Sequence, residues 1–362
     1  MSRIVGHLDI DYFYAQVEEV ENPSLKGTPV LVCVYSGRTE ESGVVSTANY
    51  RARELGVRSG MPIALAKKRL SNANATFVRM DHSKYEEYSD RLMDIMRDQV
   101  DVLEQAGIDE AYFDITKKAS GSFAAATELA RELKDKILVK EKLSCSVGIA
   151  PNKVIAKIAS DFKKPNGLTV VKDTEAKAFV ATLAVEKIYG VGPKTMKNLE
   201  ERGINTVADL AKTPTEDLAE LVGRSLAVYL HNAANGIDDE PVVERAAASQ
   251  LSRVVTLKHD TGDPDRVVGE LLPALKNLHE KLVAKGVFYR NVSVIGILKD
   301  LSLRSKGKTL ETPTNDYMTL EKETRELFAA LMSEVGELRR AGVRLGDLQS
   351  MVDQHSLTEF TG

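Results

Sequence analysis

Apolar residues follow two different spacings along the first 170 residues. Short apolar runs bounded by turn residues are typical of buried strands, whereas apolar residues that recur every three or four positions are typical of helices. These spacings predict strands at 4–10, 29–34 and 143–150, a hairpin at 108–114, and helices at 12–23, 85–103, 122–140 and 152–162. The order of elements predicts a split βαβ sheet with residues 12–81 inserted near its start, and therefore a mixed α+β fold.

The pattern changes after residue 170. Only helical spacing is present from 171 to 238, and the next ten residues, 239–248, have no clear period and are typical of a linker. Strands and helices resume in 249–350, which predicts a second α+β domain. The chain is therefore expected to have several domains.

The composition is that of an ordinary soluble protein. The 362 residues suffice for two to four domains, and 43% of them are hydrophobic. No run approaches the ~18 apolar residues of a membrane span, and the first ten residues lack the features of a secretory signal. Cys33 and Cys145 are far apart and have no CxxC or paired His, so neither a disulfide nor a zinc site is predicted. We expect a cytoplasmic protein.

Charge is unevenly distributed. The net charge of −4 and the pI of about 6.0 count against nucleic-acid binding, but a local basic surface matters more than the sum. Residues 249–350 hold 16 Lys and Arg against 14 Asp and Glu, whereas 171–238 hold 8 against 10. A basic row along a strand is predicted at Arg304, Lys306 and Lys308, extended by Arg253, Arg339, Arg340 and Arg344. Such a row would contact DNA phosphates without reading sequence; an edge strand protected by lysines is the alternative.

Carboxylates interrupt two of the predicted buried strands. Asp9 and Asp11 would share one face of the first strand, and the hairpin would bring Asp109 and Glu110 beside Asp9. Neighbours on a strand face opposite ways, so Glu110 joins Asp109 only if the backbone turns or its longer side chain reaches round. A divalent cation removes the cost of burying carboxylates, and oxygen ligands suit Mg²⁺ or Mn²⁺. A metal site for phosphoryl transfer is predicted; a solvated strand edge is the alternative.

Basic and aromatic residues suited to a nucleotide lie nearby in the sequence. Tyr50 and Arg53 share one face of a predicted helix, and a guanidinium suits phosphate oxygens. Lys164 precedes a Pro-Asn-Gly turn that would hold its ammonium near a phosphate. Tyr14 follows Asp9 by five positions, where its ring would either contact a sugar or pack in the core. The alternatives are that Arg53 forms a surface salt bridge and that Lys164 lies at a solvated loop end.

The segment "IYGVGPKT" (188–195) predicts a helix–hairpin–helix turn. Gly190 and Gly192 would leave backbone N–H groups accessible to a DNA phosphate, and Lys194 and Lys197 would add positive charge. A simple turn between two helices is the alternative.

The last residues contain a possible partner-binding peptide. Gln354, Leu357 and Phe360 have the QxxLxxF spacing of sliding-clamp peptides, although Thr361 stands where a second aromatic is usual. A frayed terminus is the alternative.

Five motifs occur in an order that resembles one family. They are "HLDIDYFYAQVE" (7–18), "TANYRAR" (47–53), "IDEAYFDI" (108–115), "SVGIAPNKVIAKIASDFKKPNG" (146–167) and "GVGPKT" (190–195). Together they resemble the Y-family translesion DNA polymerases, in particular the archaeal branch of the DinB group, over residues 1 to about 350. The resemblance implies a right hand with a palm at 1–11 and 82–170, fingers at 12–81, a thumb at 171–238, a linker at 239–248, a little finger at 249–350 and a tail at 351–362.

The resemblance also implies roles for individual residues. Metal ligands are implied at Asp9, Asp109, Glu110 and the carbonyl of Ile10, a steric gate at Tyr14, and triphosphate contacts at Thr47, Tyr50, Arg53 and Lys164. One departure is Gly107, which stands where the family usually has Ser and is therefore expected to loosen the hairpin.

The implied activity is template-directed addition of dNTPs to a primer 3′-OH with two Mg²⁺ ions, or Mn²⁺ in their place. Low fidelity, synthesis past damaged bases and no proofreading would accompany it. The implied partners are primer–template DNA, dNTP and a sliding clamp, with the chain a monomer. Another palm enzyme, such as a nucleotide cyclase or a deoxycytidyl transferase, and a non-catalytic DNA-repair scaffold are the rival functions.

Overall fold

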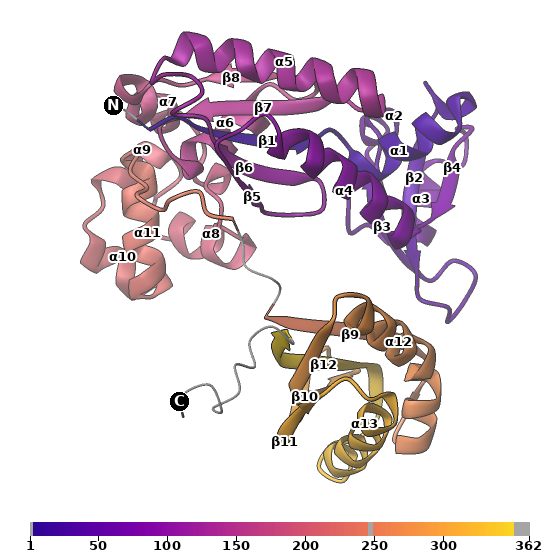
Figure 1. The fold of residues 1–362 in the computed structure, drawn as a ribbon. Coiled ribbons are helices and arrows are strands. Elements are labelled where there is room, and N and C mark those ends of the chain that lie inside the picture. The colour runs from indigo at the N-terminus through magenta and orange to yellow at the C-terminus, as the bar shows by residue number, and fades with distance from the viewer. Residues whose placement is uncertain (1–2, 245–248, 351–362) are drawn as a thin grey trace, which may run out of the picture. The chain divides into compact units, whose positions relative to one another are not determined.

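The computed structural model describes residues 3–244 and 249–350 (Figure 1). The chain forms two compact units, each considered by itself below. The first comprises Met1–Val32, Ser46–Arg58 and Asn72–Arg245, and the second Cys33–Val45, Ser59–Ser71 and Ala246–Gly362.

A five-stranded sheet organises the first unit. Its order is β5-β6-β1-β7-β8, and β1 pairs antiparallel with both β6 and β7. The strands are β1 (Val5–Ile10), β5 (Val102–Gln105), β6 (Glu110–Asp114), β7 (Cys145–Ala150) and β8 (Leu168–Val170). This topology confirms the predicted split βαβ sheet and the α+β class.

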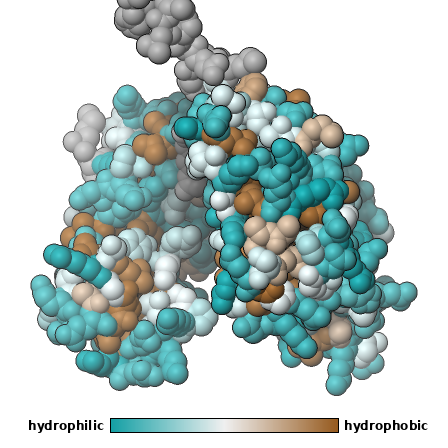
Figure 2. Space-filling view, turned by 90° about the horizontal axis from the view of Figure 1, so that it is seen from below, coloured by the Kyte–Doolittle hydropathy of each residue, from teal (hydrophilic) through white to brown (hydrophobic). Residues whose placement is uncertain are grey.

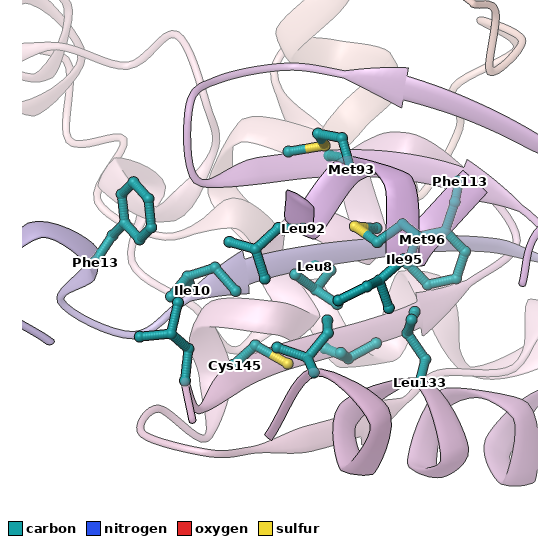
Figure 3. Packing of buried hydrophobic residues seen from close by; sticks show 14 of the residues in the cluster. Leu8, Ile10, Phe13, Leu92, Met93, Ile95, Met96, Phe113, Leu133 and Cys145 are labelled. Atoms are coloured by element: carbon teal, nitrogen blue, oxygen red, sulfur yellow. The ribbon is translucent and has the colours of Figure 1, made fainter. Parts of the chain in front are cut away.

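Helices cover both faces of this sheet. Helices α4 (His82–Arg97) and α5 (Phe123–Glu141) pack on one face over a core that includes Leu8, Ile10 and Phe113 (Figure 3). Helix α6 (Lys153–Phe162) packs on the other face, where it can approach β7 closely because Gly148 has no side chain: a Cβ there would lie 2.1 Å from a backbone oxygen of α6. The side chains of β1 that point away from α4 therefore face α6.

The helix predicted at 85–103 is too long. Helix α4 ends at Arg97, and Val102–Gln105 forms strand β5, which pairs with β6. The apolar residues at 102 and 103 continued the helical spacing by coincidence, and four residues are too few for periodicity to separate a strand from a helix.

A smaller three-stranded sheet follows the first strand in sequence. Its order is β3-β2-β4, and its helices are short. The elements are α1 (Phe13–Glu21), η1 (Pro23–Leu25), β2 (Val30–Tyr35), β3 (Gly43–Ala48), α2 (Tyr50–Glu54), α3 (Ile63–Arg69) and β4 (Thr76–Arg79). Buried Asn49 caps α2 by accepting a hydrogen bond from Ala52 N at 3.0 Å, and it donates to Glu19 of α1 at 2.7 Å. Asn49 therefore fixes α2 to α1.

The region from 171 to 238 is helical, as predicted. It contains η2 (Asp173–Glu175), α7 (Ala176–Ala181), η3 (Val185–Lys187), α8 (Pro193–Glu200), α9 (Val207–Lys212), α10 (Thr215–Val222) and α11 (Arg224–Ala234). These helices share a core with α6.

The second unit contains a four-stranded antiparallel sheet with order β11-β10-β12-β9. Its elements are β9 (Gln250–Thr261), α12 (Pro264–Ala284), β10 (Val287–Leu298), β11 (Leu303–Thr314), α13 (Tyr317–Met332) and β12 (Leu338–Ser350). Buried residues of the strands, such as Val292, Val294 and Val343, share a core with α12 and α13. One face of the sheet is thus covered by helices.

The face of the protein drawn in Figure 2 is mainly polar. Figure 2 shows apolar residues in small patches among hydrophilic ones on the face that it presents. No helix of the described ranges is both long enough and apolar enough to span a bilayer.

Candidate active site

The predicted pairing of the two acidic segments is present. Asp9 lies opposite Glu110 in the antiparallel pair β1–β6, and Ile10 N donates a hydrogen bond to Asp109 O at 2.9 Å. Asp109 immediately precedes β6, so the backbone is not yet a regular strand there. The hairpin therefore brings Asp109 and Glu110 to the end of β1, beside Asp9.

The environment disfavours the ionised form of two of these carboxyls, those of Asp9 and Asp109. Burial, reinforced by Asp109 and Asp161 and opposed by Lys164, raises the pKa of Asp9 to about 6. Burial and the charge of Glu110 raise the pKa of Asp109 as well. Both shifts have the cause expected of neighbouring carboxylates taken from water without a cation between them.

Glu110 is in a different environment. Its Oε2 lies 3.3 Å from His7 Nε2 and 2.5 Å from Lys157 Nζ. The hydrogen bond from His7, and then the ammonium of Lys157, lower the pKa of Glu110 to about 2 despite its partial burial. His7 Nδ1 lies 2.8 Å from the Ser160 hydroxyl, which fixes the ring. Glu110 is therefore held as a carboxylate.

The donor set suits a hard divalent cation. It consists of carboxylate oxygens and a backbone carbonyl, the ligands that Mg²⁺ and Mn²⁺ prefer. In residues 3–244 and 249–350, however, no three His, Cys, Asp or Glu side chains already converge as metal ligands. Instead Glu110 pairs with Lys157, and Asp9 with Lys164 at 2.6 Å. The two ammonium groups supply the positive charge that the carboxylates need.

Among the predicted phosphate-binding residues, Lys164 has a direct contact with the acidic cluster. Lys164 contacts Asp9, and the Asp9 and Asp161 carboxylates outweigh burial to raise its pKa. Arg53 lies over the Tyr50 ring, 5.1 Å from its centroid, and its Nε donates to Ala48 O at 2.8 Å. The pKa of Tyr50 is raised, first by burial and then by nearby acidic groups that include Asp9, while Arg53 and Lys164 oppose the shift. Thr47 lies in β3, half-buried.

Tyr14 lies at the start of α1 and is half-buried. Its ring packs 4.5 Å from that of Tyr85 and 5.4 Å from that of Phe13. Its pKa is raised, first by burial and then by the charge of Asp109. Tyr14 thus packs with one side of its ring against core aromatic residues.

Asp11 does not belong to the acidic cluster, contrary to its predicted position on the face of Asp9. Strand β1 ends at Ile10, and Tyr12 has a left-handed backbone with φ 37. The chain therefore leaves the strand before Asp11, whose buried carboxylate accepts hydrogen bonds from Ser144 and Ser146 instead.

Gly107 does not loosen the hairpin. Gly107 N and Ala106 N both donate to Glu110 O at 3.0 Å, so the turn is closed. A Cβ at Gly107 would lie 3.0 Å from Glu110 Cγ, which is tight contact. The glycine leaves room beside the acidic side chains.

Two groups that hold Glu110, His7 and Lys157, were not among the residues predicted for the site. A signal existed for each. His7 precedes Asp9 by two residues and so lies on the same strand face, and α6 carries a polar stripe at Lys153, Lys157 and Asp161 in an otherwise apolar helix.

The predicted turn at 188–195 precedes α8. Gly190 has φ 93, a conformation that other residues adopt rarely, and Gly192 is the N-cap before Pro193. Lys194 lies in the first turn of the helix. Near this turn, a pocket of about 380 Å³ lies between α6 and the helical region, and its lining includes Lys157, Tyr112 and Tyr189.

The predicted basic row is wrong in part, because its members lie on both faces of the second sheet. Lys306 and Lys308 pair across strands with the core residues Val294 and Val292, so they lie on the helix-covered face. Lys308 Nζ is 2.7 Å from the buried Glu323, and Lys306 pairs with Glu334. Arg304, on the same strand face, and Arg253, which contacts Asn277 of α12, also lie on this side.

Arg340 and Arg344 point the other way. They alternate along β12 with the buried residues Ala341 and Val343, and both are exposed. Arg339 lies at a register irregularity between Leu338 and Arg340. The sequence did not reveal that these arginines and the lysines of β11 lie on opposite faces, because the direction of a side chain depends on strand register. The clamp-like residues Gln354, Leu357 and Phe360 lie outside the described residues.

Comparison with known proteins identifies the family. The impB/mucB/samB family matches residues 8–161, its C-terminal domain matches 248–358, and a SAM-like helix-hairpin-helix tandem matches 183–235. The chain is 42% identical to DNA polymerase IV of Nitrosopumilus maritimus over 361 residues, 99% of either chain. It is 40% identical to DNA polymerase IV of Saccharolobus solfataricus over 360 residues, again 99% of either chain. It belongs to the Y-family of DNA polymerases.

Solved structures agree with this assignment. The Y-family DNA polymerase chimera Dbh-Dpo4(243-245)-Dbh has a TM-score of 0.86 and 39% identity, with 96% of this chain and 99% of that one covered. The insertion ternary complex of Dbh DNA polymerase has a TM-score of 0.72 at the same identity and coverage. This Y-family member is of the archaeal DinB type, a DNA-directed DNA polymerase of the low-fidelity translesion class. The predicted family, fold and enzyme class are confirmed, and a cyclase or a non-catalytic scaffold is not supported.

Proposed function

We propose that Asp9, Asp109, Glu110 and the carbonyl of Ile10 hold two divalent cations, Mg²⁺ with Mn²⁺ as a substitute, for nucleotidyl transfer to a primer 3′-OH. The observation that carries this proposal is the pairing of β1 with β6, which brings Asp109 and Glu110 beside Asp9, and the raised pKa of Asp9 and Asp109 agrees with it. When bound, the ions would supply positive charge at the reacting phosphate and favour the ionised 3′-OH.

The surrounding side chains prepare the carboxylates for this role. Lys157 and His7 keep Glu110 ionised, since its pKa lies near 2. Lys164 offsets the charge of Asp9 and is long enough to follow a phosphate that arrives there. A cation that replaces these contacts must therefore compete with two ammonium groups for the same oxygens.

Five residues are proposed to contact the incoming dNTP. Arg53 and Lys164 would contact the triphosphate oxygens, with the hydroxyls of Tyr50 and Thr47 donating hydrogen bonds beside them. The stacking of Arg53 on Tyr50, together with its bond to Ala48 O, limits the guanidinium to few orientations. Tyr14 would pack against the deoxyribose and collide with a 2′-OH.

Primer–template DNA is proposed to contact the turn at 190–194 and the second sheet. The backbone N–H groups near Gly190 and Gly192, with Lys194, would bind a phosphate. In the second sheet, the uncovered face that carries Arg340 and Arg344 suits DNA phosphates better than the helix-covered face. There the ammonium groups of Lys306 and Lys308 are already paired with glutamates.

The domain boundaries given for the hand, a monomeric state and a cytoplasmic location remain part of this proposal. A tail peptide of residues 350–362 is proposed to bind a sliding clamp through Gln354, Leu357 and Phe360. Loss of binding in a Phe360→Ala peptide would support this contact, and equal clamp affinity of the full chain and a version ending at Ser350 would rule it out.

The proposal is tested by primer-extension assays that differ in one component only. Each contains either a chelator or one of the cations Mg²⁺, Mn²⁺ and Ca²⁺. Extension should occur with Mg²⁺ and Mn²⁺ and stop in the chelator. An Asp9→Ala variant should fail in every condition, whereas Asp94→Ala, which changes an exposed carboxylate on α4, should behave as wild type. Extension that persists in the chelator would contradict the metal assignment.

A further inference from the structure

Asp11 is a buried carboxylate with an unexpected set of partners. Its side chain is about 1% exposed. Its two oxygens accept hydrogen bonds from Ser146 Oγ at 2.8 Å, Ser144 Oγ at 2.9 Å and the backbone N–H of Asn166 at 2.8 Å. Ser146 lies in β7 and Ser144 directly precedes that strand, whereas Asn166 belongs to the turn between α6 and β8. Asp11 thus joins the beginning of the chain to that turn.

The turn at 163–167 is held at two successive amides. Besides the bond from Asn166 N to Asp11, Gly167 N donates to Ser146 Oγ at 3.1 Å. Asn166 adopts a left-handed backbone with φ 55. A Cβ at Gly167 would lie 2.4 Å from Lys163 O, so the chain is tightly folded here. Such a turn keeps one conformation only while its amides are bound.

A second side chain holds the same turn from α5. Lys134 Nζ lies 2.8 Å from Asn166 Oδ1 and 3.1 Å from Gly167 O. Within the part of the chain that the structure describes, Lys134 has no contact with Asp9, Asp109 or Glu110. Asp11 and Lys134 therefore hold the turn from two separate elements.

Lys164 lies in this turn, two residues before Asn166. Its ammonium reaches Asp9 at 2.6 Å and Asp161 at 2.7 Å. A lysine side chain has several freely rotating bonds, so the place of its ammonium depends on where its backbone is held. The position of the turn thus limits which atoms Lys164 can reach.

We propose that Asp11 is a positioning residue for the incoming nucleotide: its carboxylate holds the 163–167 turn and thereby keeps the Lys164 ammonium beside Asp9, where the triphosphate binds. This inference rests on the proposed contact of Lys164 with the triphosphate. Asp11 does not touch the nucleotide in this account; it acts through Lys164.

Two other roles for Asp11 make different predictions. If its charge acted directly on the triphosphate, neutralising it would remove a repulsion and lower KM for the nucleotide. If it served stability alone, its loss would lower Tm and leave KM unchanged. Positioning through Lys164 predicts a higher KM that depends on Lys164 being present.

The test is a double-mutant cycle of Asp11→Asn and Lys164→Ala with steady-state KM and kcat for a single dNTP. The Asn amide retains the shape of Asp11 but cannot accept all three hydrogen bonds. Asp11→Asn should raise KM about tenfold and change kcat less than about threefold, and it should add nothing in the Lys164→Ala background. Hydrogen exchange at Asn166 and Gly167 should become faster. Lys134→Met should act in the same direction, whereas Lys140→Met, an exposed lysine on the same helix, should not.

The outcomes separate this inference from the proposed function. If Lys164→Ala leaves KM unchanged, the nucleotide contact itself fails, and the positioning role fails with it. If Lys164→Ala raises KM but the effect of Asp11→Asn is additive, absent or opposite in sign, only the positioning role is overturned. Should Asp11→Asn fail to fold, Ser146→Ala replaces it in the cycle with the same expectations, because it removes the acceptor of Gly167 N and a donor to Asp11.

Discussion

The ammonium of Lys164 lies 2.6 Å from a carboxylate oxygen of Asp9, and yet the pKa of Asp9 remains raised to about 6. One lysine therefore does not offset the burial of this carboxyl and the charge of its acidic neighbours. The folded protein without metal holds a proton on Asp9 between pH 3.8 and about 6, where the unfolded chain releases it. By linkage, the contribution of Asp9 to stability falls as the pH rises across this range and stays unfavourable above it.

Asp9→Asn should accordingly stabilise the metal-free protein at neutral pH. In chelator at pH 7.5 we expect the free energy of unfolding to rise by about 1–3 kcal/mol. At pH 4.5 only about a third of this gain should remain, because Asp9 is mostly protonated in the folded state there while the unfolded chain has already released most of its proton. Thermal and denaturant unfolding at the two pH values measures this. Asp94→Asn, a change of an exposed carboxyl, should shift stability by less than about 0.5 kcal/mol.

The same variant should lose its response to metal. Mg²⁺ should raise the Tm of the wild type in a concentration-dependent way, because a ligand of the folded state alone stabilises it, and it should have little effect on Asp9→Asn. A lower Tm for Asp9→Asn in chelator at pH 7.5 would contradict this view of the carboxyl.

The rings of Tyr14 and Tyr85 form a tilted pair, and the two residues should have different roles. Tyr14→Ala should stay folded and lose at least about tenfold of its preference for dCTP over CTP opposite template G, roughly 1.4 kcal/mol. Tyr85 is fully buried, so Tyr85→Ala should lower the free energy of unfolding by about 3–5 kcal/mol. Insertion kinetics with both nucleotides, beside denaturant unfolding, separates the two. An unchanged sugar preference in Tyr14→Ala would remove it from the role of gate.

The two faces of the second sheet allow a matched test of DNA binding. Replacing Arg340 and Arg344 by Ala should weaken primer–template binding and reduce the slope of log K against log salt by about 1 for each lost phosphate contact. Replacing Lys306 and Lys308 by Met removes the same charge from the helix-covered face and should change the slope little, because both already pair with glutamates. Binding titrations at several salt concentrations measure both slopes. Equal losses in the two variants would mean that the uncovered face has no special part in binding DNA.

The features that could be predicted from the sequence are those specified by residues close to one another along the chain. Asp9, Asp109 and Glu110 are predictable because each lies in a short motif, and the hairpin expected at 108–114 contains β6. The partner strand β5 was instead expected to be the end of a helix. Glu110, by contrast, is paired with Lys157, 47 positions away, and no local pattern specifies that partner.

The remaining errors have a similar cause. Asp11 was placed on the face of Asp9 because the sequence does not reveal that the strand ends one residue earlier, at Ile10. The basic row was assigned to one face because the directions of Lys308 and Arg344 depend on strand register and on an irregularity beside Arg340. Such features depend on how distant segments pair with each other, and the spacing of apolar residues along the chain carries no information about that pairing.

The most direct test of the central claim is single-turnover primer extension by Asp109→Asn in saturating Mg²⁺ and dNTP. Asparagine keeps the size of the side chain but removes the charge that a cation requires. The account predicts a rate at least about 100-fold below that of the wild type, because electrostatic stabilisation of the transition state is lost. Affinity for primer–template DNA and Tm should remain close to those of the wild type. A rate within about tenfold of the wild type would contradict the assignment of this acidic cluster as the catalytic centre.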